Sequence, residues 1–309
     1  MKKSKTQRGI NFYRAKFKKD FQIYLIIFPA ILFYFVFSYI PLYGITLAFR
    51  DYQFDKGILY SPWIGLRFFK LFFNYYDLWN LVRNTLVISF FKIVLYFPFP
   101  IIMALLINEV KCRPFKRISQ TISYLPNFIS WAAAVVVIQQ FLSLDGIVNT
   151  YRVGMGLKAI FFMSDVEWFY SNMFFSYVWK NVGMGSIIYL AAISGVDPNI
   201  YEAAIMDGCS KLKRVWYITI PQILPTATIL FILSLSHILS AGWDQIYLLR
   251  TPGNMELANI LDTYVLDVGL SQGQFSYATA VSLIQGLVGF FMIIATNKFA
   301  KKLTNISIF

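Results

Sequence analysis

Long uncharged stretches dominate the pattern of hydrophobic and polar positions along this chain. No Asp, Glu, Lys or Arg occurs in residues 21–49, 118–144, 215–243 or 268–297. Two further apolar stretches, at 86–107 and 169–193, contain one lysine each, Lys92 and Lys180. A helix that crosses a bilayer needs about 20 mostly apolar residues. The pattern therefore predicts an all-α integral membrane protein with six transmembrane helices, at 21–48, 85–107, 118–143, 169–193, 219–241 and 275–297.

The apolar runs show none of the short alternating segments of a transmembrane β-barrel. The first run follows a basic tail, as in a secretory signal peptide, but it is too long and lacks a small-residue cleavage site. We therefore expect an uncleaved anchor. The chain divides into a basic tail, residues 1–20, and a six-helix membrane domain, residues 21–309.

The distribution of Lys and Arg orients the predicted helices, because cytoplasmic loops carry the excess of basic residues. That excess lies in the N-terminal tail, in the loops 108–117 and 194–218, and in the C-terminal segment. The three opposite loops, at 50–82, 144–167 and 242–274, together contain more acidic than basic residues. Both termini are therefore predicted to be cytoplasmic.

Composition narrows the class of protein further. Of the 309 residues, 58% are hydrophobic and 14% are charged, unlike the composition of a soluble enzyme. The net charge of +13 is explained by the basic residues of the predicted cytoplasmic loops and by their attraction to an anionic lipid bilayer. Because this explanation is sufficient, we expect no nucleic-acid partner. Cys112 and Cys209 lie on the predicted cytoplasmic side, and no Cys/His cluster exists. Neither a disulfide framework nor a metal site is expected.

The predicted outer segment 50–83 is rich in aromatic residues. Trp and Tyr favour the level of the lipid headgroups, which is the simpler interpretation. A lid or a docking surface for an external partner is the alternative, and the two are compatible.

The connector 194–221 carries the strongest local signal. Asp197 suits a helix N-cap, Pro198 suits the first helical position, and Gly208 suits the left-handed residue that ends a helix. Ser210 then caps a second short helix, and Thr219 and Pro221 begin the fifth span. A plain connector needs only a few residues.

The first of these short helices has a surface suited to a protein partner. Ala203 and Ala204 permit close approach of another backbone, and Glu202 and Asp207 offer charge to a cationic partner. Insertion into a cleft of another protein and an amphipathic helix lying on the membrane both account for it.

The same segment resembles the EAA loop of ABC importer permeases. The family pattern is EAA, three residues, Gly, nine residues and I-x-L-P. The chain matches it with Glu202-Ala203-Ala204, Gly208, Ile218 and Pro221, while Ile220 replaces the usual Leu. Shorter elements similar to those of sugar permeases occur at Trp63–Phe68, Asn84-Thr85-Leu86 and Thr251-Pro252-Gly253. Phe28-Pro29-Ala30 and Tyr39–Gly44 resemble the LplB-type branch, which is associated with complex oligosaccharides.

The resemblance implies a permease subunit of a type I ABC importer in the bacterial plasma membrane. Its cargo would be a sugar or oligosaccharide delivered by an extracellular solute-binding lipoprotein. A second, related permease and two cytoplasmic ATPase subunits would complete the assembly. The chain contains no G-x-x-x-x-G-K-[ST] phosphate loop, so ATP and Mg²⁺ are expected in the ATPase subunits and no enzymatic activity in this chain. A secondary transporter or channel is the alternative, although it would favour inverted repeats and intramembrane carboxylates.

The EAA loop implies a set of coupling residues. Glu202 is expected to pair with a basic residue in the ATPase cleft, and Gly208 to let the chain turn. The full expected set is Glu202, Ala203, Ala204, Asp207, Gly208, Ile218 and Pro221.

The path of the cargo is expected where the fourth and fifth spans face the second permease. Lys180 lies near the middle of the fourth span, and an intramembrane charge indicates a functional site. Ser234, His237 and Ala241 share one helical face by spacing. Trp179 and Trp243 are expected to stack on sugars, and Lys180, Asn181, Ser234 and His237 to bond hydroxyls.

Other roles stay open for three of these intramembrane residues. Lys180 would be a counter-charge for an anionic cargo such as a uronate, or it pairs with an inter-helix carbonyl. His237 is a cargo ligand or a packing residue. Lys92 has no partner nearby in the sequence and is interpreted as structural.

Overall fold

The computed structural model describes residues 20–304, so most of the predicted tail 1–20 lies outside the described residues. The described residues form helices and connecting turns, and their one β-bridge joins Arg50 and Trp63. The all-α prediction is therefore confirmed. The chain divides after Phe68 into two compact units.

The first unit contains one long apolar helix and a short ordered loop. The helix runs over Phe21–Phe49 as α2 (Phe21–Tyr34), the π-helical η1 (Phe35–Tyr39) and the 3₁₀-helical η2 (Ile40–Phe49). Arg50 orders the loop that contains α3 (Gly57–Tyr60), because its guanidinium donates to the carbonyl oxygens of Leu59 (2.6 Å) and Ser61 (2.9 Å). The same guanidinium lies 5.6 Å from the centre of the Trp63 ring.

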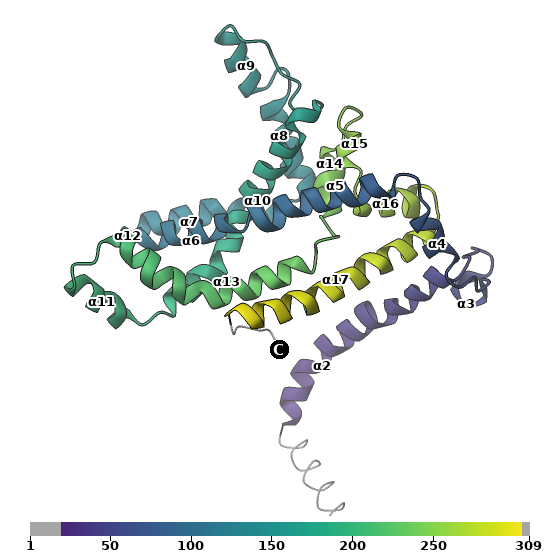
Figure 1. Cartoon of the computed structure of the whole chain (residues 1–309), viewed down its shortest axis with the longest axis horizontal. Coiled ribbons are helices and arrows are strands. Elements are labelled where there is room, and N and C mark those ends of the chain that lie inside the picture. Colours follow the sequence, from purple (N-terminus) through teal and green to yellow (C-terminus); the bar gives the residue numbers. More distant parts are fainter. Residues whose placement is uncertain (1–19, 305–309) are drawn as a thin grey trace, which may run out of the picture. The chain divides into compact units, whose positions relative to one another are not determined.

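The second unit begins within α4 (Arg67–Phe73) and is built around α10 (Val166–Ser194), which packs along α6, α7 and α13. Figure 1 shows these long helices running in similar directions. Glycine makes one of these contacts close: a Cβ at Gly183 would lie 2.0 Å from the Ser123 carbonyl oxygen of α7. The long helices of this unit include α5 (Leu78–Phe90) with η3 (Phe91–Leu95), α6 (Pro98–Glu109), α7 (Arg113–Phe128), α10, α13 (Ile220–Leu235) and α17 (Phe275–Thr304).

The predicted third span, 118–143, is not one helix, and that expectation is wrong. α7 ends at Phe128, and α8 (Trp131–Leu142) begins after Ser130, whose hydroxyl accepts from the Ala133 amide at 3.2 Å. The break has a local cause, because Pro126 lacks an amide hydrogen and Ser130 starts a new helix. Figure 1 shows α8 and α9 (Ile147–Gly154) leaving the direction of α7.

The predicted fifth span, 219–241, begins earlier and ends earlier than expected. α12 (Lys211–Arg214) and the π-helical η4 (Val215–Thr219) continue directly into α13, so the expected second short helix is the start of this span. The helix ends at Leu235. At this end the hydroxyls of Ser234 and Ser236 donate to the carbonyl oxygens of Phe231 and Leu233.

Five described helices are long and apolar enough to cross a membrane: Phe21–Phe49, Leu78–Glu109, Trp131–Gly154, Lys211–Leu235 and Phe275–Lys298. α10 is long enough but is not among them. Its polar side chains bond inside the protein; for example, Asn172 donates to the Phe162 carbonyl oxygen at 2.6 Å. The sixth span and the cytoplasmic termini stay predictions.

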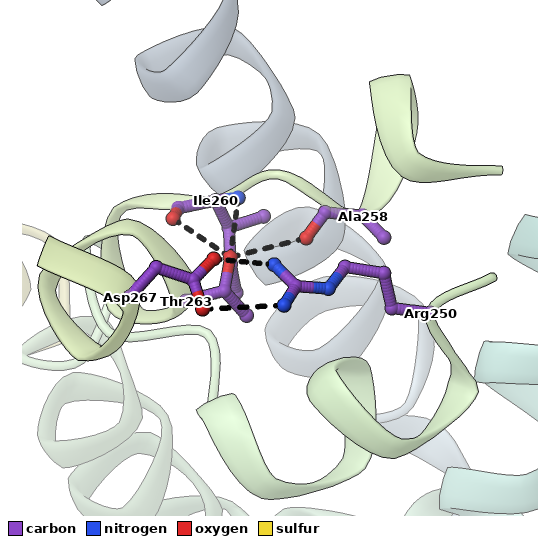
Figure 2. Close-up of polar contacts among 5 residues, drawn as sticks. All are labelled: Arg250, Ala258, Ile260, Thr263 and Asp267. Atoms are coloured by element: carbon purple, nitrogen blue, oxygen red, sulfur yellow. Dashed lines mark hydrogen bonds and ion pairs between the residues drawn. The ribbon is translucent and has the colours of Figure 1, made fainter. Parts of the chain in front are cut away.

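The segment before α17 is held together by hydrogen bonds and an ion pair between its polar groups. It contains α14 (Trp243–Leu249), α15 (Met255–Ala258), α16 (Leu261–Leu266) and the π-helical η5 (Asp267–Ser271). Arg250 forms a bidentate ion pair with Asp267, at 2.6 and 3.2 Å, and that hydrogen bond raises the pKa of Arg250. Figure 2 shows this pair beside Thr263, whose hydroxyl bonds the backbone of Ala258 and Ile260.

Asn84 and Thr85 connect α5 to this segment. The Asn84 amide donates to the carbonyl oxygens of Glu256 (2.7 Å) and Asn259 (3.0 Å), and the Thr85 hydroxyl accepts from the Leu261 amide (2.9 Å). Both side chains are buried. The Asn-Thr-Leu element therefore has a structural role, which is to hold the segment before α17 against α5.

Candidate coupling helix and membrane cavity

The short helix of the EAA-like segment is α11 (Pro198–Met206), and it is closed at both ends as its sequence predicts. The Asp197 carboxylate accepts from the Asn199 amide at 3.0 Å. At the other end, Gly208 and Cys209 donate to the carbonyl oxygens of Ile205 and Ala204, at 3.0 and 2.9 Å. Gly208 has φ +72° and no atom within 4 Å of a Cβ position. Its role is therefore conformational and not steric.

Side-chain bonds hold α11 to the start of the following long helix. The Tyr201 hydroxyl lies 2.9 Å from the Thr219 hydroxyl, and Thr219 is buried. The Arg214 guanidinium donates to the Cys209 carbonyl oxygen at 3.0 Å. These two bonds connect α11 and the turn after it to α12 and η4, which continue into α13. Ile218 and Pro221, the last residues of the EAA-like pattern, lie in this same helix.

The opposite side of α11 is exposed. Glu202, Ala203 and Asp207 are exposed, as are the apolar side chains of Ile205 and Met206. Ala204 is half-buried. Within the described part of the chain, neither Glu202 nor Asp207 has an ion-pair partner. The face combines unpaired negative charge, small residues and apolar side chains.

A cavity of about 430 Å³ lies among the long helices of the second unit. Its walls combine aromatic rings with hydroxyl, imidazole and charged groups. The polar and aromatic residues that line it are Ser89, Lys92, Tyr96, Phe97, Trp131, Tyr177, Tyr189, Ser234, His237, Ser240 and Asp244.

Lys92 finds its partners far away in the sequence. Its ammonium donates to the Ala241 carbonyl oxygen at 2.7 Å and lies 5.0 Å from the centre of the Tyr177 ring. The amide of Gly242, in the same peptide unit, donates to the Asp262 carboxylate at 2.9 Å. Burial raises the pKa of Asp262 above its ordinary value, which the hydrogen bond from Gly242 opposes.

The residues expected along the cargo path fall on different surfaces. Ser234 and His237 line the cavity with Ala241, although the helix ends before His237. His237 is exposed, unlike a buried packing residue. Trp179 lines a separate apolar groove on α10, and Trp243 lines a third one beside Asp262.

Lys180 makes the inter-helix carbonyl contacts of the second interpretation. Its ammonium donates to the carbonyl oxygens of Pro126 (3.2 Å), Asn127 (3.0 Å) and Ile129 (2.6 Å), and it lies 5.4 Å from the Trp131 ring centre. Lys180 therefore stabilises the end of α7. The neighbouring Asn181 likewise bonds within the bundle, to the Tyr177 carbonyl oxygen and the Asn127 side chain.

Comparison with known proteins gives a consistent result. The family described as binding-protein-dependent transport system inner membrane component matches residues 96–305. Protein LplB of Bacillus subtilis (strain 168) is 40% identical over 296 residues, 96% of this chain and 93% of that protein. The polygalacturonan/rhamnogalacturonan transport system permease protein YteP of the same organism is 42% identical, over 91% of this chain and 88% of that protein.

A solved structure shares the fold. It is the crystal structure of a bacterial alginate ABC transporter in complex with alginate pentasaccharide-bound periplasmic protein, and one of its chains is 32% identical to this chain. The TM-score is 0.84, with 95% of this chain and 99% of that chain covered.

Proposed function

The chain belongs to the family of binding-protein-dependent transport system inner membrane components, and from this membership we propose a complete role for it in ATP-driven import. It is a multi-pass membrane permease of a sugar or oligosaccharide ABC transporter. Members of this family are transport proteins and not enzymes. In our proposal the chain pairs with a second, related permease. Two ATPase subunits bind ATP and Mg²⁺, and an extracellular solute-binding protein delivers the cargo.

The observation that carries the coupling role is the construction of α11. Both of its ends are closed by its own residues, and Tyr201 ties it to the helix that leads into the membrane. Its exposed face keeps Glu202 and Asp207 unpaired in the described part of the chain. A rigid helix with an exposed acidic and small-residue face suits a basic cleft in an ATPase subunit, whose closure would then move α13.

The names of the relatives support an oligosaccharide as cargo. One relative is named for polygalacturonan and rhamnogalacturonan transport, and the structural neighbour is an alginate transporter seen with a periplasmic protein. We propose that this chain transports oligosaccharides, of a size similar to the alginate pentasaccharide of the structural neighbour. The cavity beside Lys92 is the segment of the path that this chain supplies, because hydroxyl and aromatic groups bind sugars.

Crosslinking tests the docking of α11 on an ATPase subunit. The two natural cysteines, Cys112 and Cys209, are replaced by serine, and Ala203→Cys is introduced. We expect Ala203→Cys to crosslink to the ATPase subunit in the purified assembly. The coupling role is contradicted if the new thiol reacts only with water-soluble or lipid-soluble thiol reagents and never crosslinks to a second polypeptide.

Two substitutions test the same role through uptake. Glu202→Lys and Gly208→Val should abolish ATP-dependent uptake while the assembly stays in the membrane. Glu109→Lys is the matched control, because Glu109 is an exposed acid at the end of α6 with the same charge change. Uptake at the wild-type rate by either α11 variant would refute the proposal.

A further inference from the structure

The charges around the cavity are balanced within the protein. Among the lining residues, all of them in the described part of the chain, Lys92 is the single Lys or Arg. Its ammonium bonds the carbonyl of the Ala241–Gly242 peptide unit, and the amide of that unit bonds the Asp262 carboxylate. One peptide unit thus lies between a cation and an anion. Asp262 also accepts from Gln285 at 3.0 Å, so its position is fixed from two sides.

Asp262 is not among the lining residues of the cavity, whereas Asp244 is a second carboxylate beside the same peptide unit. Asp244 lines the cavity, and one of its oxygens accepts from the Gln245 amide at 2.9 Å. A Cβ at Gly242 would lie 3.5 Å from the Lys92 ammonium nitrogen and 3.8 Å from an Asp244 oxygen. The ammonium and the carboxylate therefore flank one point of the cavity wall.

Among the residues that the structure describes, no other lysine or arginine lines this cavity. Lys180, the second intramembrane lysine, is not among the lining residues, and its ammonium donates to three carbonyl oxygens at the end of α7. A carboxylate on the cargo would therefore lie beside the Asp244 carboxylate, and the charge of Lys92, the one ammonium in the lining, is already offset by Asp244. Burial of an uncompensated charge beside like charges is unfavourable.

The remaining groups are suited to sugar hydroxyls. The Ser89 hydroxyl is buried, at 1% exposure, and has no hydrogen-bond partner among the described residues. Buried polar atoms without partners are rare and call for an explanation, such as a bound ligand. Ser89 lines the cavity, as do the hydroxyl-bearing residues Tyr96 and Tyr177. An ammonium has three N–H donors, and Lys92 uses one on Ala241, so it can still donate.

We propose that this cavity binds one uncharged sugar unit, with Lys92 and Asp244 bonding its neighbouring hydroxyls and Ser89 bonding a third. A hydroxyl both donates and accepts, so two adjacent hydroxyls match an ammonium beside a carboxylate. This inference rests on the proposed function as a sugar permease and specifies the class of sugar unit that this chain contacts. It makes Lys92 and Asp244 specificity-determining residues.

Binding of matched disaccharides to the full permease–ATPase assembly in nanodiscs tests the proposal. The solute-binding protein is left out, because its own specificity would mask that of the cavity. The probes are tritiated galactobiose with digalacturonate, and mannobiose with dimannuronate. Each pair differs in the C6 group, which is a hydroxymethyl in one member and a carboxylate in the other. We expect at least one neutral probe to bind about tenfold more tightly than its acidic counterpart.

Variants assign this preference to residues. Asp244→Asn removes one negative charge with little change of shape. The ratio of neutral to acidic disaccharide affinity should therefore fall about tenfold. Ser89→Ala should weaken neutral binding severalfold and leave the stability of the assembly unchanged. Ser171→Ala, in the separate groove of α10, is the matched control and should bind like the wild type.

Three results would overturn the proposal: equal binding within both pairs, tighter binding of the acidic members, or no binding of either neutral probe. An unchanged preference in Asp244→Asn would remove that residue from specificity. Crosslinking through Ala203→Cys is independent of the cavity. An assembly that crosslinks there but prefers the uronates refutes this inference and leaves the proposed function intact.

Discussion

Lys180 provides a test of how the interior of the second unit is held together. Its ammonium bonds the carbonyl oxygens of Pro126, Asn127 and Ile129, where α7 ends. The last carbonyls of a helix have no partner within the helix, and a cation there is favourable. Lys180→Met keeps a flexible chain of similar size and removes all three hydrogen bonds.

The expected loss of stability follows from these contacts. A hydrogen bond to a charged group contributes about 1.5–3 kcal/mol, but the three share one ammonium and their contributions are not additive. A buried acceptor that loses its hydrogen-bond donor costs about 1–3 kcal/mol. Methionine carries no charge that must lose its hydration on burial, and this gain offsets part of the cost. We therefore expect Lys180→Met to lower the free energy of unfolding by about 3 kcal/mol. At about 2–4 °C per kcal/mol for a unit of this size, the Tm should fall by about 6–12 °C.

Thermal unfolding of the purified assembly in detergent measures this change. Lys180→Arg is the matched control, because it keeps the cation and its donors, and its Tm should lie within about 3 °C of the wild type. A wild-type Tm for Lys180→Met, combined with lost uptake, would show that Lys180 acts on the cargo. In that case the helix-end role derived from the carbonyl contacts would be wrong.

Three further substitutions test other parts of the structure. Gly183→Ala should lower the Tm strongly, because its Cβ would lie 2.0 Å from a backbone oxygen of α7, whereas Gly286→Ala has open space and should not lower it. Gly208→Asn should retain uptake that Gly208→Val loses, because asparagine tolerates the left-handed conformation that this position requires. Arg250→Met should destabilise the segment before α17 by about 1–3 kcal/mol and speed its cleavage in limited proteolysis, and Arg250→Lys should restore part of the loss through its remaining bond to Asp267.

Local signals in the sequence are sufficient to predict both ends of α11. Asp197, Pro198 and Gly208 act on their own backbone or that of residues a few positions away, so each can be interpreted without knowledge of the fold. The apolar runs likewise predict most of the long helices. The break at Ser130 was missed, although Pro126 and Ser130 were present as signals, because the whole stretch is uncharged and hydropathy alone predicts continuity there.

The cavity was harder to predict, because its residues meet only in the folded chain. Lys92 bonds Ala241, which lies 149 positions later in the sequence, and no periodicity links the two. Adjacency was also misleading for Trp179, Lys180 and Asn181. Successive residues of a helix are rotated by about 100°, so Trp179 points to a separate groove, whereas Lys180 and Asn181 both bond Asn127 at the end of α7.

A single helix connects the two candidate sites. The helix Lys211–Leu235 has 25 residues and is about 37 Å long at 1.5 Å per residue. Near its start, Thr219 bonds Tyr201 of α11, and near its end Ser234 lines the cavity. Because a continuous helix resists bending except at irregular points, the π-helical turn at Val215–Thr219 and the proline at Pro225 are the places where it can yield. Under the proposed function, displacement of α11 by an ATPase subunit therefore reaches the cavity wall through this one helix, which can bend at Pro225 on the way. The same movement would shift Ser234 relative to Lys92, which is anchored on another helix, and so change the site that holds the cargo.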